Sequence, residues 1–235
     1  MIKHFNLNIF EKDSNNISKQ NYLNLKFKNR DIDFIEEQEK RIEYNYDLNM
    51  KYFNTLDFAE FDEYLINFTK KHKFVEISDL TKLKGVSGVY ILVLDKYKQV
   101  YIGISEAGIA ERIRKHWNDK KDPERLIFGQ AFNSVLSIDS FGALDTTRIF
   151  VKTDVPLYLV EYKYVEEFDN KYILNRTIGG IGSPFTYSDD SKTALVTIAA
   201  NSKRRDFSQF IDEKELYEKC NSYDTMMYES KKTNT

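Results

Sequence analysis

The chain has 235 residues, of which 41% are hydrophobic, and this is enough for one compact domain with a buried core and extensions. Its formal net charge of −2 excludes a uniformly basic surface, so any contact with nucleic acid must come from a local patch. The single cysteine, Cys220, excludes an intrachain disulfide framework and a cysteine-rich zinc site, and the lack of an apolar run of membrane-spanning length predicts no membrane partner and a cytoplasmic location.

Residues 1–84 are expected to form a mainly helical N-terminal extension. The alternating start at residues 4–10 predicts an edge strand, and the polar stretch at residues 11–21 predicts a loop. Three helical segments follow: one from Asp31, one capped by Asp57, and a short turn from Asp79 to Lys84 that Gly85 ends. The pattern does not indicate what this region does.

From Gly88 the apolar residues alternate, turn at residues 95–98, and alternate again, which predicts a β-hairpin. If the turn closes the hairpin, Tyr90 pairs with Gly103, and Tyr90 and Tyr101 lie on the same face. Two phenols then converge beside a glycine that leaves room for a large group to approach the backbone. The hairpin is therefore a candidate binding site.

The segment after the hairpin has the pattern of a helix that carries positive charge. Apolar residues recur every four positions and predict an inward-facing stripe: Ile109, Ile113 and Trp117. Arg112 and His116, also four apart, form a second and polar stripe, and Lys115 adds charge nearby. A guanidinium and an imidazole beside two phenols suit a phosphate group.

Residues 122–145 form an insertion before a third strand, which is expected at residues 147–151. Within it, residues 126–138 predict a buried helix or an irregular segment, and residues 139–145 a loop. Because loops on a rigid scaffold commonly carry specificity, we interpret this insertion as a place for target recognition.

A further helix is expected from Asp154, which precedes Val155 and Pro156 in the manner of a capping residue before a first-turn proline. Residues at spacings of four, three and four form its apolar stripe: Leu157, Glu161, Tyr164 and Phe168. A carboxylate on a core-facing stripe costs free energy unless it is paired, hydrogen-bonded or bound to a cation. Glu161 is therefore a candidate metal ligand.

The C-terminal part, residues 181–235, is expected to be a helical segment with a frayed tail. The glycine-rich run at residues 179–184 is interpreted as a turn at the edge of the domain. The basic residues 203–205 could contact a DNA backbone or form a solvated helix end.

The sequence Gly88-Val89-Tyr90, ten residues, Tyr101-Ile102-Gly103, and then Arg112 and His116 on the next helix, resembles the GIY-YIG nuclease superfamily over residues 85–180. The resemblance implies an α/β (α+β) fold in which a small three-stranded antiparallel sheet is flanked by helices. It also implies a carboxylate on a later helix, which Glu161 matches, and an asparagine after it, which Asn175 matches.

The activity implied by this resemblance is metal-dependent hydrolysis of DNA phosphodiester bonds, with Glu161 holding one divalent cation, Mg²⁺ or Mn²⁺. The expected catalytic residues are Tyr90, Tyr101, Arg112, His116 and Glu161, and the expected substrate-binding residues are Gly103, Lys115 and Asn175. A tyrosine is implied as general base, and either phenol could serve.

Three biological functions are compatible with these residues. The first is a stand-alone, sequence-specific DNA endonuclease of the restriction, defence or mobile-element type. The second is a structure-selective repair or recombination nuclease, which reads DNA shape. The third is a DNA-binding protein that has a nuclease scaffold but does not cleave DNA. The presence of Tyr90, Tyr101, Arg112 and Glu161 argues against this third function. Because cutting a duplex needs two strand cleavages, a restriction-type enzyme would be a possible homodimer.

Overall fold

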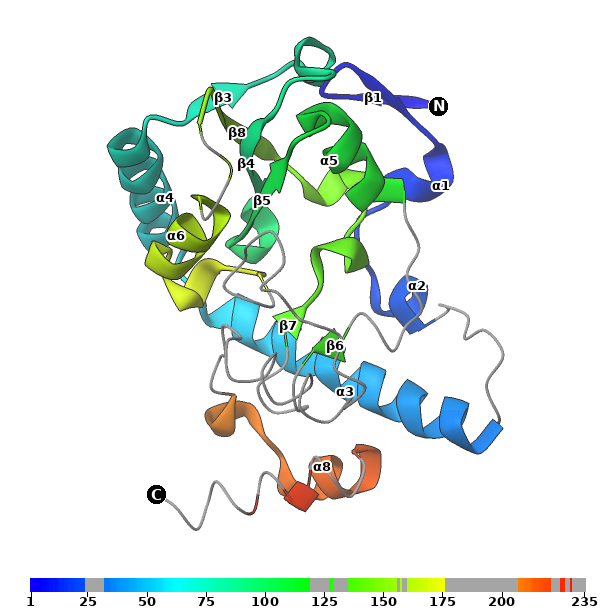
Figure 1. Cartoon of the computed structure of the whole chain (residues 1–235). Helices are drawn as coiled ribbons and strands as arrows, with labels where there is room; N and C mark the ends of the chain where they lie inside the picture. Colours follow the sequence, from blue (N-terminus) through cyan, green and yellow to red (C-terminus); the bar gives the residue numbers. More distant parts are fainter. Residues whose placement is uncertain are drawn as a thin grey trace, which may run out of the picture.

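The computed structural model describes residues 1–23, 32–118, 127–128, 135–155, 157, 160–175, 207–220, 225–226 and 229. These residues form a mixture of helices and antiparallel sheet (Figure 1). The strands are β1 (Ile2–His4), β2 (Leu7–Ile9), β3 (Val75–Ile77), β4 (Gly88–Leu94), β5 (Gln99–Ser105), β6 (Ile127–Phe128), β7 (Val135–Leu136) and β8 (Arg148–Thr153). The α-helices are α1 (Glu11–Ser14), α2 (Lys19–Leu23), α3 (Ile32–Thr55), α4 (Phe58–His72), α5 (Ile109–Asn118), α6 (Val160–Glu167) and α8 (Glu213–Lys219). The 3₁₀ turns are η1 (Leu80–Leu83), η2 (Asp95–Tyr97), η5 (Ile138–Ser140), η6 (Ala143–Asp145), η7 (Asn170–Tyr172) and η8 (Ser208–Phe210).

The central sheet contains the predicted hairpin and the predicted third strand. Strands β4 and β5 pair in the register derived from the sequence, with Tyr90 opposite Gly103 and Leu92 opposite Tyr101. The η2 turn closes the hairpin, and Lys98 completes it with a left-handed φ of 51°. Strand β8 pairs antiparallel with β4 on the other side, so both predictions are confirmed.

The sheet has four strands in the order β3-β8-β4-β5, and not the three that were expected. The additional strand, β3, comes from the region predicted to be a mainly helical extension, and it pairs with β8. Its three residues are mostly exposed, so the sequence has no alternating pattern long enough to reveal them. The region before Gly85 therefore shares this sheet with the hairpin.

Both faces of β4 are covered. Helix α5 packs on the face that carries Tyr90 and Leu92, and α4 and α6 pack on the face that carries Val89 and Ile91 (Figure 1). All seven residues of β4 are buried. A strand that is buried on both faces needs a nearly continuous apolar sequence, and Gly88–Leu94 has one.

Apart from β3, the N-terminal region differs from the prediction in its first 23 residues. The expected edge strand is a hairpin of β1 and β2, because Phe5 and Asn6 turn the chain with φ values of 46° and 61°. The expected loop at residues 11–21 contains α1 and most of α2. The three helical segments expected after it are α3, α4 and η1, and the Asp57 side chain accepts a hydrogen bond of 2.9 Å from the Glu60 amide as a cap.

The insertion and the C-terminal part are described incompletely. Residues 126–138 were expected to form a buried helix or an irregular segment, and their described part contains the short antiparallel strand pair β6 and β7. The expected loop at residues 139–145 contains η5 and η6. Helix α8 packs against α3 beneath the sheet domain (Figure 1). The predictions for residues 179–184 and 203–205 lie outside the described residues. Within the described part of the chain, no helix is long and apolar enough to cross a membrane.

A buried carboxylate joins three segments that are distant in sequence. Asp145 is 1% exposed. One of its oxygens accepts hydrogen bonds from Asn16 Nδ2 at 2.9 Å and from the Tyr97 hydroxyl at 2.8 Å. The other accepts from the amides of Ile17 and Gly142, each at 2.8 Å. The N-terminal region, the hairpin turn and the insertion are thereby held together.

Replacing this carboxylate, by Asp145→Ala, is expected to lower the free energy of unfolding by about 3 kcal/mol or more, because each buried donor left without an acceptor costs about 1–3 kcal/mol. Urea unfolding at neutral pH measures the loss. Glu63→Ala removes an exposed acid from α4 and should leave the midpoint nearly unchanged. Equal midpoints for the two variants would show that the Asp145 network contributes little to stability.

Candidate active site

The two phenols expected to share a site do lie on the same face of the hairpin. Their ring centroids are 6.4 Å apart, and α5 covers this face. Tyr90 is completely buried, whereas Tyr101 is partly exposed. The site therefore has one phenol in the interior and one that solvent can reach.

The space beside Gly103 is filled by the Tyr90 ring. A Cβ atom at Gly103 would lie 2.5 Å from Tyr90 Cζ and 3.0 Å from Tyr101 Cε1, and it would also meet the Tyr90 hydroxyl. The sequence suggested that a ligand would use this space, but a glycine is needed there to admit the protein's own Tyr90 side chain. Gly103 thus sets the position of Tyr90.

Tyr90 belongs to a hydrogen-bonded chain that runs into the protein. Its hydroxyl lies 2.9 Å from His116 Nε2, and His116 Nδ1 lies 2.8 Å from Asp139 Oδ1. The side chains of His116 and Asp139 are only 5% and 4% exposed. The other oxygen of Asp139 accepts a hydrogen bond of 3.2 Å from the Ser137 hydroxyl. The ring of Tyr101 meets the His116 ring edge-on at 5.0 Å between centroids.

Sequence reasoning missed Asp139. It lies in η5, within the insertion, 23 residues after His116. No periodic spacing connects a residue on a helix with a residue in a distant loop. The only available signal was that buried histidines need a hydrogen-bonding partner, which does not say where that partner lies.

Arg112 connects the buried phenol with the surface. The residue is exposed, and its guanidinium lies close enough to the Tyr90 phenol for the two groups to influence each other's pKa. Burial acts to lower the pKa of Arg112, but the nearby phenols of Tyr90 and Tyr101 and the carboxylate of Asp139 outweigh it and raise the pKa. The guanidinium therefore stays charged. Lys115, on the same helix, is also exposed.

The pKa of Tyr90 is raised well above its ordinary value. Burial is the main cause, the nearby Tyr101 and Glu161 raise it further, and Arg112 opposes them. The phenol is therefore protonated at neutral pH. The protonated hydroxyl can donate its hydrogen to His116 Nε2, 2.9 Å away.

Glu161 lies in the first turn of α6, and its charge acts on Tyr90 from there. The residue is partly buried, and Tyr164 and Phe168 on the same stripe are 5% and 1% exposed, which confirms the predicted stripe for these residues. The helix begins at Val160 and not at Asp154. Asp154 has a left-handed φ of 57°, whereas a capping residue is extended, so it turns the chain instead.

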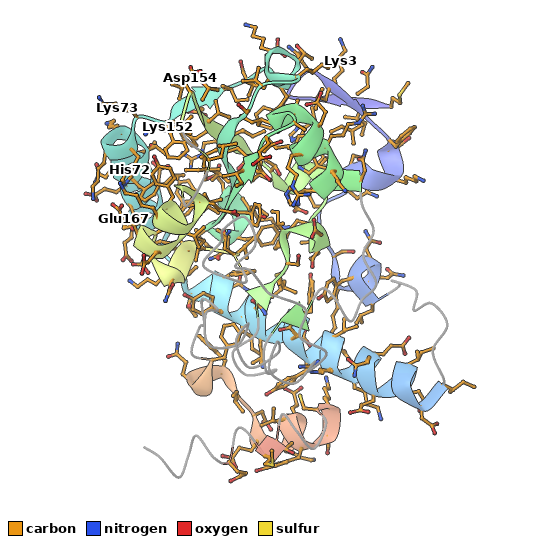
Figure 2. All side chains as sticks on the ribbon, viewed as in Figure 1. Lys3, His72, Lys73, Lys152, Asp154 and Glu167 are labelled. Atoms are coloured by element: carbon orange, nitrogen blue, oxygen red, sulfur yellow. The ribbon has the colours of Figure 1, made fainter. Side chains whose placement is uncertain are left out.

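Polar contacts between α4, β8 and α6 fix the position of the helix that carries Glu161. His72 Nε2 lies 2.9 Å from Glu167 Oε1, and both residues are labelled in Figure 2. Lys152 Nζ donates to the His72 carbonyl at 2.8 Å and to the Tyr164 hydroxyl at 3.0 Å. These bonds join the middle of α6 to β8 and its C-terminal end to α4.

The donor set suits a cation that shares its coordination with water and substrate. Among the described residues, no group of three or more His, Cys, Asp or Glu side chains could hold a metal ion. An all-protein cage for Ca²⁺ or Zn²⁺ is therefore not formed by them. A single carboxylate at Glu161 fits Mg²⁺ or Mn²⁺, since Mg²⁺ keeps several waters and commonly binds through one or two carboxylates plus phosphate oxygens.

Asn175 supports the strand beside the phenols. Its Oδ1 accepts from the Ile102 amide at 2.9 Å, and its Nδ2 donates to the Ile102 carbonyl at 2.7 Å. The Leu174 amide donates to the Val100 carbonyl at 2.7 Å, so residues 173–175 run along the outer edge of β5. Both ends of the asparagine amide are thus engaged by the backbone between Tyr101 and Gly103, and its expected substrate contact stays a prediction.

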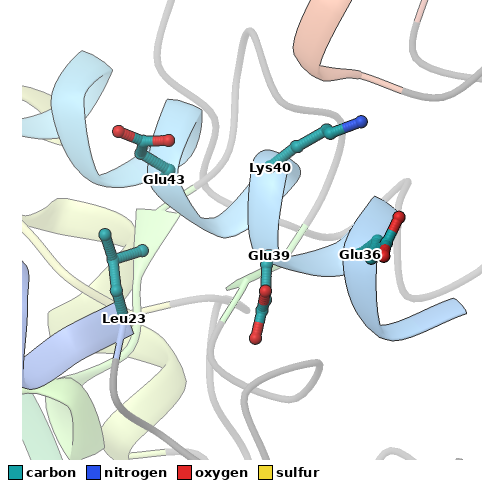
Figure 3. Close-up of a pocket in the computed structure, with 5 residues that line it drawn as sticks. All are labelled: Leu23, Glu36, Glu39, Lys40 and Glu43. Carbon is teal, nitrogen blue, oxygen red and sulfur yellow. The ribbon is translucent and has the colours of Figure 1, made fainter. Parts of the chain in front are cut away.

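A pocket of about 470 Å³ lies elsewhere, between α2 and α3 (Figure 3). Its lining consists of Leu23, Glu36, Glu39, Lys40 and Glu43. Three carboxylates and one ammonium disfavour a phosphate, and none of these residues belongs to the tyrosine site. The chemistry described above is therefore not located in this pocket.

No protein-family model, no curated protein and no solved structure matches the chain.

Proposed function

We propose that the protein is a metal-dependent endonuclease that hydrolyses DNA phosphodiester bonds, of the GIY-YIG type. The observation that carries this proposal is the network of Tyr90 with Arg112 and His116, on which the charge of Glu161 acts from another helix. The order β4, β5, α5, β8 and α6 along the chain, with β8, β4 and β5 adjacent in the sheet, supports it. The spacing of the two tripeptide motifs supports it independently.

The accessible side of the site would contact the substrate. Arg112 is exposed and charged, and a planar guanidinium can hold a phosphate oxygen and stabilise the charge that develops on it in the transition state. Tyr101 is partly exposed beside it. Lys115 would contribute a second positive charge toward the DNA backbone.

The buried side of the site would take up a proton. Because its pKa is raised, Tyr90 is almost never present as the phenolate at neutral pH. It can instead accept a proton from water while its own proton passes to His116, 2.9 Å away. Of the two tyrosines, Tyr90 is thus the better placed for base catalysis. Because it is completely buried, the water it activates must be enclosed with the substrate.

Glu161 would hold the divalent cation. When bound, such a cation neutralises charge on the scissile phosphate and on the leaving oxygen. The carboxylate also places a negative charge near Tyr90, which keeps the phenol protonated until the reaction begins.

Incubating the purified protein with supercoiled plasmid, branched DNA and single-stranded RNA, with Mg²⁺, with Mn²⁺ and with a chelator, tests this proposal. Discrete plasmid fragments are the expected result for a sequence-specific enzyme of the restriction, defence or mobile-element type. Preference for junctions would indicate the structure-selective class. Binding of DNA without cleavage under any of these conditions would contradict the proposal and favour a non-cleaving DNA-binding protein.

The close contact at Gly103 leads to a prediction about this activity. Gly103→Ala should lower kcat about 10²-fold, because the added methyl group displaces the Tyr90 phenol and small misplacements have effects of this size. Single-turnover cleavage measures the change. Gly85→Ala is a matched control with no neighbour within 4 Å of the added Cβ, although its positive φ will lower stability. A Gly103→Ala enzyme with the wild-type rate would show that the position of Tyr90 does not matter.

A further inference from the structure

The Asp139 carboxylate determines which nitrogen of His116 carries the proton. An ionised carboxylate only accepts hydrogen bonds, so His116 Nδ1, 2.8 Å from Asp139 Oδ1, must be the protonated nitrogen of the neutral ring. Nε2 is then unprotonated and can accept a hydrogen bond, and the Tyr90 hydroxyl lies 2.9 Å from it. The Ser137 hydroxyl donates to the second oxygen of the Asp139 carboxylate and so fixes the orientation of that carboxylate.

The charged groups around His116 explain why the Asp139 carboxylate is needed to stabilise a protonated imidazole. Tyr90 and Tyr101 face the imidazole from the sheet, Asp139 faces it from η5, and Arg112 lies one turn earlier on α5. The negative charge of Glu161 raises the pKa of Tyr90, which is hydrogen-bonded to His116. A protonated His116 would be a buried cation near the charged Arg112, and a cation removed from water is unfavourable without a partner. Asp139 faces both cations and can balance them.

We propose that Asp139 is a positioning residue that holds His116 in the Nδ1–H tautomer, with Nε2 ready to receive the Tyr90 proton. The catalytic consequence rests on the proposed nuclease function. As the water oxygen forms a bond to phosphorus, the bond from phosphorus to the leaving oxygen breaks, and that oxygen takes a proton from solvent. At the same time one O–H bond of the water breaks and a new O–H bond forms on Tyr90. The original Tyr90 O–H bond breaks and an N–H bond forms at His116 Nε2. The imidazolium carries the positive charge beside the Asp139 carboxylate, and the proton returns to solvent after the product leaves.

The tautomer can be measured without any substrate. The chain contains three histidines, so ¹⁵N-labelling of histidine produces a spectrum simple enough to assign with His4 and His72 variants. In the neutral ring of His116, Nδ1 is expected to show the shift of a protonated nitrogen and Nε2 that of an unprotonated one. In Asp139→Asn the amide can donate to Nδ1, so the two shifts should exchange. A neutral wild-type ring protonated at Nε2, or shifts that Asp139→Asn leaves unchanged, would overturn the proposal.

Cleavage kinetics test the consequence for catalysis. Asp139→Asn is expected to lower kcat by about 10²- to 10⁴-fold on plasmid DNA, with KM nearly unchanged, because base catalysis is lost while substrate contacts remain. Asp154→Asn makes the same chemical change at an exposed site and should keep the wild-type rate. Equal rates for the two variants would remove the positioning role from Asp139.

The two experiments separate this proposal from the function on which it rests. If the wild-type protein cuts no nucleic acid, the nuclease proposal fails, and the tautomer measurement still decides how Asp139 holds His116. If Asp139→Asn does not fold, the wild-type spectrum alone decides the tautomer. Ser137→Ala, which keeps the carboxylate and removes one hydrogen bond, then tests the effect on kcat. A reduction is expected, and an unchanged rate would count against the positioning role.

Discussion

Glu161→Gln is expected to reduce Mg²⁺-dependent cleavage of plasmid DNA by about 10³-fold or more. A glutamine side chain has nearly the same shape but no charge, so it cannot replace the carboxylate as an anionic ligand. Cation stabilisation of a phosphoryl transition state contributes several kcal/mol, and each 1.36 kcal/mol corresponds to a factor of ten in rate. Among the described residues, no group of three or more His, Cys, Asp or Glu side chains could hold a metal ion. These residues therefore offer no alternative metal site of that kind.

The fold of this variant should be intact, because Glu161 is only partly buried and the packing of α6 depends on Tyr164 and Phe168. Circular dichroism and thermal unfolding would check this. Glu166→Gln, an exposed change on the same helix, is the matched control and should cleave at the wild-type rate. Wild-type cleavage by Glu161→Gln under Mg²⁺ would show that Glu161 does not hold the metal.

The second large effect is expected at Arg112. Arg112→Lys should lower kcat about 10²- to 10³-fold although the charge is kept. An ammonium lacks the planar fork that can bond the Tyr90 oxygen and a phosphate oxygen at once. Preorganised donors aimed at developing charge have effects of this size. Single-turnover cleavage measures the rate, and a fluorescence assay of DNA binding should show a change of only a few-fold.

Arg114→Lys is the matched control for Arg112→Lys, since Arg114 is exposed on the same helix. Its rate should equal that of the wild type. A result in which both variants cleave normally would mean that only charge matters on α5. Arg112 would then be a backbone contact and not a residue that stabilises the transition state.

Local patterns were sufficient for the parts of the fold that depend on neighbouring residues. The hairpin register follows from the alternation on both sides of a short turn, so the facing of Tyr90 and Gly103 was predictable. The stripe of Ile109, Ile113 and Trp117 is buried as its helical spacing predicts. The Asp57 cap likewise depends on contacts within one helical turn.

Other features depend on contacts between distant segments, for which a sequence carries no periodic signal. Strand β3 is a strand because β8 offers it free hydrogen-bonding groups, and its own three residues do not favour one conformation. Helix α6 starts at Val160, and Asp154 adopts a left-handed conformation where its local sequence favours a helix cap.

By itself, the sequence determined the residue types of the candidate site and the element that carries each of them, because strand and helix periods decide which side chains share a face. The tertiary structure alone decided how these side chains are used. It filled the space beside Gly103 with Tyr90, engaged Asn175 with the β5 backbone, and brought Asp139 to His116. The physical reason is that burial and hydrogen bonding act on whatever folding brings within a few ångströms, however far apart it lies in the chain.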